Sequence, residues 1–171
     1  MAIDELNARS PGIGGRAVRF ELMAEDDQAD PRTGTIVAQR LVDAGIRGMV
    51  GHFNSGVSIP ASKIYADAGI PQISVSTAVR YTRQGYRTAF RVMADDDQQG
   101  AALGRYATGP LKLKRLAVID DRTAYGQGLA DAFAAAVKAA GGQVVRREYT
   151  TDKEFDFRAI LVTIRSAAPE A

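Results

Sequence analysis

Small hydroxyl and amide side chains follow two successive apolar segments in residues 50–77, which read VGHFNSGVSIPASKIYADAGIPQISVST. The two polar clusters are Asn54, Ser55 and Gly56 after the first segment, and Ser76, Thr77 and Ala78 after the second. If these segments are parallel strands, ligands lie beyond their carboxyl ends, next to helix N-termini. Free amides, the helix dipole and small hydroxyls there bind an anion such as a carboxylate. Composition alone favours a simpler interpretation, in which Ser55 and Ser76 are only turn and cap residues.

Other chemistry is weakly supported. His52 is the only histidine and there is no cysteine, so we expect a packed, hydrogen-bonded histidine and no metal site. Asp120 and Asp121 end an apolar segment, where an acidic Mg²⁺ pocket is one alternative and a solvated loop with a helix cap at Asp121 is the favoured one. The Gly-Gln-Gly run at 126–128 begins like a dinucleotide fingerprint, but Asp131 occupies the third glycine position. We therefore expect no cofactor and no catalytic residue.

Composition is that of an ordinary soluble globular protein of 171 residues, with 46% hydrophobic and 25% charged residues. A net charge of +2 is too small to indicate nucleic-acid binding. The basic cluster Lys112, Lys114 and Arg115 is interpreted as a solvated loop. No apolar run approaches the ~20 residues of a membrane span, and the chain does not begin with the pattern of a signal peptide.

The order of strands and helices predicts an α/β fold. The predicted strands are residues 18–22 (a half-exposed edge strand), 48–50, 73–76, 90–93, 116–119 and 144–149. The first predicted helices are 1–8, 31–45, and one that has Pro60 in its first turn and ends at Gly69. A fourth is capped by Asp95–Asp97 and ends near Gly109. The last two have apolar faces formed by Leu129, Phe133 and Val137, and by Phe157, Ile160 and Ile164. This alternation implies parallel sheets with helices on both faces.

Three blocks of the sequence resemble the periplasmic leucine/isoleucine/valine-binding proteins. The blocks are GHFNSGVSIPASKIYADAGIPQIS, YTRQGYRTAFRVMADDDQQGAALGRY and RLAVIDDRTAYGQGLADAF. Members of this family are substrate-binding components of branched-chain amino acid ABC transporters. The resemblance therefore implies the type I periplasmic-binding-protein fold, in which two doubly wound parallel-sheet lobes close on an amino acid or related carboxylate.

The resemblance also implies roles for individual residues. Ser55 matches a serine that holds the ligand carboxylate, with Asn54 beside it. Thr77 is the counterpart of a threonine after the next strand, and Ser76 and Ala78 flank it with an alignment ambiguous by one residue. Tyr125 matches a tyrosine that reaches the ligand from the second lobe, which would favour the closed state.

Relative to the family, the chain is expected to be truncated at both ends. We expect residues 1–95 to form a first lobe without its first strand, and residues 96–171 to begin a second lobe. Missing strands would leave unpaired sheet edges, so marginal stability or self-association through those edges is expected, together with weak ligand binding. The family's second-lobe acidic residue would lie outside this chain.

Partners and location follow from the resemblance alone. It implies an amino acid ligand, a membrane permease of an ABC transporter and a periplasmic location. Two alternatives stay open: a ligand-sensing regulatory or receptor domain of the same fold, and an α/β enzyme that uses Asp120 or Asp121, supported only by fold analogy. The sequence does not name the ligand, since aliphatic and aromatic amino acids, amides and aromatic acids all suit the family.

Overall fold

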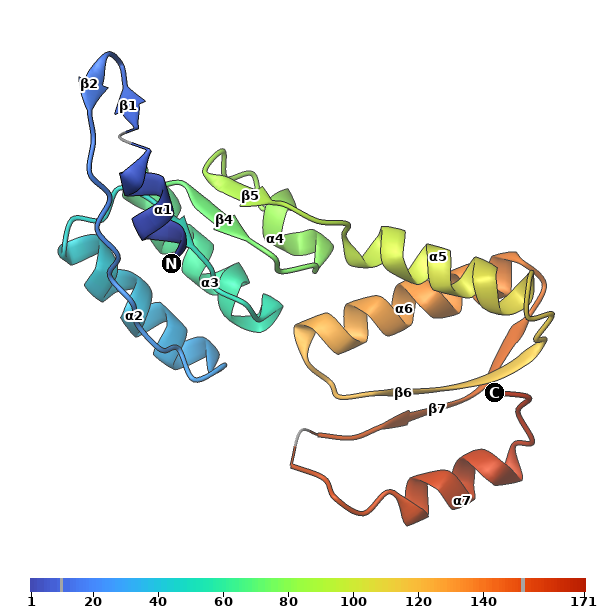
Figure 1. The fold of residues 1–171 in the computed structure, drawn as a ribbon. Coiled ribbons are helices and arrows are strands. Elements are labelled where there is room, and N and C mark those ends of the chain that lie inside the picture. Colours follow the sequence, from blue (N-terminus) through green and yellow to red (C-terminus); the bar gives the residue numbers. More distant parts are fainter. Residues whose placement is uncertain (10, 152) are drawn as a thin grey trace.

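A computed structural model describes residues 1–9, 11–151 and 153–171 as an α/β chain with separate parallel sheets in its two halves (Figure 1). The helices are α1 (Ala2–Ala8), α2 (Pro31–Asp43), α3 (Ser55–Asp67), α4 (Val79–Arg83), α5 (Asp96–Thr108), α6 (Ala124–Ala139) and α7 (Arg158–Ser166). The strands are β1 (Gly12–Ile13), β2 (Arg16–Ala17), β3 (Met49–Val50), β4 (Gln72–Ser74), β5 (Ala89–Arg91), β6 (Arg115–Asp120) and β7 (Gln143–Tyr149).

The first sheet has the order β3-β4-β5, and all three strands are parallel. Helices α2 and α3 pack against each other beside it, around a core of Ala38, Ala61, Tyr65 and Ile70. The N-cap of α2 is Asp30, whose carboxylate accepts from the Thr33 amide at 2.7 Å. Because consecutive strands are parallel neighbours, the segments that leave β3 and β4 emerge at one edge of the sheet.

Helices do not cover both faces of the first sheet in the part of the chain that the structure describes. Val50, Ile73 and Phe90 are in register across the three strands and are 87%, 41% and 49% exposed. The expectation of helices on both faces is therefore wrong for this sheet. The face opposite α2 and α3 presents a row of apolar side chains to solvent.

The predicted edge strand at residues 18–22 is wrong, because the segment is not a strand and pairs with none among the described residues. The Val18 amide donates to the Pro11 carbonyl at 2.9 Å, and the Asn7 side chain accepts from the Phe20 amide at 2.8 Å and donates to the Phe20 carbonyl at 2.9 Å. The short hairpin of β1 and β2 precedes it, turning through Gly14 and Gly15. Both glycines have positive φ, as a two-residue hairpin turn requires.

The second sheet consists of β6 and β7, which are parallel. Helices α5 and α6 lie on one side of it and α7 on the other (Figure 1). The last residues of the chain pair with the free edge of β6, since the Ala117 amide donates to the Ala171 carbonyl at 2.7 Å. Leu116 and Val137 are buried between β6 and α6 together with Ala107 of α5.

Two local expectations about helices need correction. Pro60 lies inside α3, not in its first turn, because the helix already begins at Ser55. The N-cap of α6 is Thr123, whose hydroxyl accepts from the Gly126 amide, whereas Asp121 accepts from Thr123. Within the described residues, every helix is too short or too polar to span a membrane.

Candidate functional site

The two polar clusters predicted from the sequence meet in the structure. Ser55 is the first residue of α3 and Ala78 directly precedes α4, and the Ala78 amide donates to Ser55 Oγ at 3.2 Å. The contact arises because α3 follows β3 and the Ala78 turn follows β4, its parallel neighbour. A hydroxyl that accepts one hydrogen bond still has its own hydrogen to donate. Ser55 can therefore offer that hydrogen to a ligand oxygen.

The N-terminus of α3 adds amide donors beside Ser55. The Asn54 carbonyl accepts from the amides of Val57 and Ser58 at 3.0 and 2.9 Å, whereas the amides of Ser55 and Gly56 have no intrahelical acceptor. Asn54 itself is exposed, and its side chain makes no capping hydrogen bond. These amides and the helix dipole favour an anion at this end of α3.

Ser76 belongs to a buried serine cluster with Ser58 and Ser74. Ser76 Oγ lies 2.5 Å from Ser58 Oγ and donates to the Phe53 carbonyl at 3.1 Å. Ser74 Oγ donates to the His52 carbonyl at 2.5 Å. The hydroxyl of Ser76 thus ties the ends of β3 and β4 together, and its contact with a ligand stays a prediction.

Asp96 is a residue that the sequence reasoning missed. It is the first residue of α5, is 1% exposed, and its amide donates to the carbonyl of the buried Thr77 at 2.9 Å. Among the described residues, neither of its carboxylate oxygens has a hydrogen-bond partner. On the other side lies α6, where a methyl group added at Gly128 would come within 3.0 Å of Asp96 Oδ2. The carboxylate therefore lies between the Thr77 turn and α6.

Burial raises the pKa of Asp96, because water no longer solvates the ionised carboxylate. The nearby Thr77 side chain and the positive charge of Arg91 oppose this rise, while the neighbouring Asp95 and Asp97 add to it. A buried carboxylate without partners is costly, and such groups gather at functional sites. A cation placed against Asp96 would supply the missing partner.

Arg91 connects the turn at Ala78 to the start of α5. Its guanidinium donates to the Ala78 carbonyl at 3.2 Å and to Asp95 Oδ2 at 3.3 Å. Asp95 in turn caps α5, since its Oδ1 accepts from the Gln98 amide at 3.0 Å. Arg91 and Asp95 are both largely buried. The donors around Ser55 and the carboxylate of Asp96 are thereby held in one constellation.

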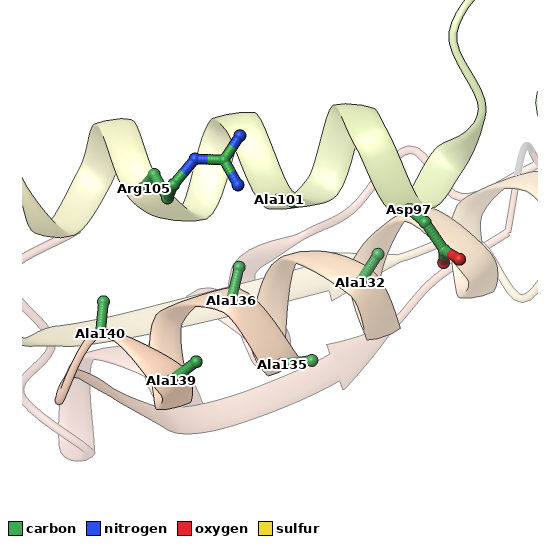
Figure 2. A pocket seen from close by; sticks show the side chains of 8 residues that line it. All are labelled: Asp97, Ala101, Arg105, Ala132, Ala135, Ala136, Ala139 and Ala140. Carbon is green, nitrogen blue, oxygen red and sulfur yellow. The ribbon is translucent and has the colours of Figure 1, made fainter.

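Tyr125 lies on α6, three residues before the Gly128 that faces Asp96. It is the second residue of α6, is 43% exposed, and lines a cavity of about 490 Å³ beside β6. A second cavity of about 590 Å³ runs between α5 and α6 (Figure 2). Neither cavity is lined by Ser55 or Thr77. Helix α3 contacts α6, but a contact of Tyr125 with the ligand stays a prediction.

The remaining candidate residues have structural partners. His52 is buried, with Nδ1 2.6 Å from Asp27 Oδ2 and Nε2 3.2 Å from the Tyr65 hydroxyl, which confirms a hydrogen-bonded histidine. The expectation of a solvated loop is wrong for Asp120, which is buried and bonds Arg147 at 2.7 Å. Because Arg147 already neutralises this carboxylate, the geometry does not favour a Mg²⁺ pocket there.

A match over the whole chain identifies its family. Residues 1–171 match the family described as periplasmic binding protein. The chain belongs to this family. It is 40% identical over 167 residues to Leu/Ile/Val-binding protein homolog 1 of Brucella abortus, covering 97% of this chain and 44% of that protein. The resemblance stated from the sequence is therefore confirmed.

Solved structures of this family share the fold. One is an ABC transporter substrate-binding protein from Desulfitobacterium hafniense in complex with Leu, with 31% identity and a TM-score of 0.76, covering 96% of this chain and 48% of that one. Another is an ABC transporter solute-binding protein from R. palustris in complex with benzoate, with 25% identity and a TM-score of 0.84, covering 96% and 46%. This periplasmic binding protein thus has the type I fold and spans about half the length of these relatives.

Proposed function

We propose that this chain binds a small free amino acid of the branched-chain type, as part of the substrate-binding component of an ABC transporter. The observation that carries the proposal is the unpaired, buried carboxylate of Asp96, one backbone hydrogen bond from Thr77. Next to that turn, where the Ala78 amide donates to Ser55 Oγ, Ser55 and the amides at the start of α3 offer donors to an anion. Donors and a carboxylate together match the two charges of an amino acid.

This arrangement supports a ligand with both charges, such as leucine, over a simple carboxylate such as benzoate. Leucine carries an ammonium group that would pair with Asp96, whereas benzoate carries only the carboxylate. With benzoate bound, the Asp96 carboxylate would stay buried and unpaired, which is unfavourable. We therefore propose an amino acid, and not an aromatic acid, as the ligand.

The mode of action proposed is binding and closure without bond chemistry. Residues 1–95 and 96–171 would form parts of two lobes, with α5 beginning the second lobe directly at Asp96. A ligand that contacts both parts favours the closed arrangement by its differential affinity for it. Tyr125, at the start of α6, is the proposed contact from the second lobe. In a periplasmic location, the closed form would present the ligand to a membrane permease.

Isothermal titration with leucine and with the leucine analogue that lacks the amino group tests the ligand class. Leaving a buried charge unpaired costs about 2 kcal/mol or more, so leucine should bind about 30-fold or more tightly. Asp96→Asn should bring the ratio of the two affinities close to one, whereas Asp97→Asn, one exposed residue further on, should preserve it. Equal affinity of the wild-type chain for both compounds, or preference for benzoate, would contradict the proposal.

The pH dependence of binding provides a second readout. Only the ionised form of Asp96 attracts an ammonium group, and burial raises its pKa. Leucine affinity should therefore increase as pH rises through the raised pKa of Asp96 and then level off. Asp96→Asn should abolish this increase, because the carboxylate of leucine itself is ionised throughout this pH range. An identical pH profile for leucine binding to the wild type and to Asp96→Asn would separate Asp96 from ligand recognition.

A further inference from the structure

An alanine-lined groove between α5 and α6 lies outside the proposed ligand site (Figure 2). Its cavity of about 590 Å³ is bounded on α6 by Ala132, Ala136 and Ala139. On α5 it is bounded by Asp97, Ala101 and Arg105. An open groove with such small side chains allows another helix to approach closely.

The shape of the groove follows from the close packing of α5 on α6. A methyl group at Gly100 would lie 2.5 Å from Ala132 Cβ, and one at Gly104 would lie 2.6 Å from Ala136 Cβ. The two glycines therefore explain the contact within the chain. They do not explain the alanines next to that contact that stay exposed, such as Ala139.

The charges on the α5 wall form a self-complementary pattern. Asp97, Ala101 and Arg105 follow at intervals of four residues, so they lie along one face of the helix. Asp97 and Arg105 are about 12 Å apart along the axis and equally far from Ala101. Both are exposed, and neither joins an ion pair among the described residues.

We propose that this groove binds a second copy of the chain, with the two α5 helices antiparallel about a twofold axis at Ala101. In that arrangement Asp97 of each copy faces Arg105 of the other, and the alanines of α6 flank the crossing. A twofold contact uses the same surface on both copies. The order Asp97, Ala101, Arg105 is complementary to itself when the second helix runs in the opposite direction, because each acid then faces a base. An unrelated helical partner would have to supply the matching charges independently.

Charge exchange tests the proposal by sedimentation of the full chain over a range of concentrations. Asp97→Arg places like charges at both contacts of the twofold, as does Arg105→Asp, so each should weaken the dimer about tenfold or more. The double variant Asp97→Arg/Arg105→Asp restores both attractions and should restore the dimer. As a control, Lys63→Glu on α3 should leave association unchanged. A wild-type chain that stays monomeric, or a double variant no better than the singles, overturns the proposal.

Cysteine cross-linking locates the axis, because the chain contains no cysteine of its own. Ala101→Cys should form a disulfide-linked dimer under mild oxidation, since position 101 faces its own copy. Ala102→Cys, on the exposed side of α5 that does not line the groove, should cross-link at least tenfold more slowly. Association through the sheet edges would leave the two variants alike, and that result would also overturn the proposal.

Discussion

Replacing Asp96 by asparagine should stabilise the chain at neutral pH, although it removes a proposed ligand contact. The wild-type carboxylate is 1% exposed and has no hydrogen-bond partner among the described residues. An unsatisfied buried polar group costs about 1–3 kcal/mol, and a charged one more. The neutral amide removes the charge and keeps nearly the same volume. A gain of about 1–3 kcal/mol in the free energy of unfolding corresponds to about 2–4 °C in Tm per kcal/mol for a chain of this size.

The pH dependence of that gain follows from the raised pKa of Asp96. Between the unfolded and folded pKa values, the folded chain keeps a proton that the unfolded chain has lost. Wild-type stability therefore falls as pH rises through this window and is constant above it. The gain from Asp96→Asn should be full above the folded pKa and should vanish below the unfolded one.

Thermal unfolding of the wild type, Asp96→Asn and the control Glu21→Gln, at an exposed acidic residue, over a series of pH values measures this. A Tm for Asp96→Asn below that of the wild type at neutral pH would refute the reasoning, as would a gain that does not shrink in acid. The first result would mean that the carboxylate has a stabilising partner in the folded chain.

Three further substitutions test the packing around the site. Ser55→Ala should lower the free energy of unfolding by about 1–3 kcal/mol by leaving a buried amide unpaired, and should weaken leucine binding; unchanged denaturant curves and affinity would contradict this. Arg91→Ala should cost about 3 kcal/mol by removing the ion pair of the largely buried Asp95, against at most about 0.5 kcal/mol for the exposed Arg83→Ala, and equal losses would show that the Arg91–Asp95 ion pair is unimportant. Gly100→Ala should cost about 1–3 kcal/mol because its methyl group meets α6 at 2.5 Å, so an unchanged melting temperature would contradict the observed helix packing.

Much of the fold could be predicted from local patterns. Asp30 caps α2 as the Asp-Pro pair indicated, and Asp95 caps α5 at the start of the acidic run. The meeting of Ser55 with Ala78 could also be anticipated, because the ends of parallel neighbouring strands always lie at one edge of a sheet. That expectation needed only the order of strands and helices.

The predictions that failed concern interactions between residues that lie far apart in the sequence. Alternation at 18–22 indicated a strand, but a strand needs a neighbour, and here Asn7 takes the backbone groups of Phe20. Asp96 was hidden among three consecutive aspartates, of which a helix cap uses only one. The two aspartates that the cap does not use could have indicated a functional residue, but the burial of Asp96 depends on its packing against Gly128 in α6. No local pattern contains that contact.

The central claim is that the start of α3 and the Ala78 turn hold the carboxylate of an amino acid. Amide chemical shifts of the isotopically labelled chain during a leucine titration test it most directly. The account predicts that the largest changes fall on the amides of Ser55, Gly56 and Ala78, and that they saturate together. Saturable changes confined to residues of the α5–α6 groove, with these three amides unmoved, would contradict it.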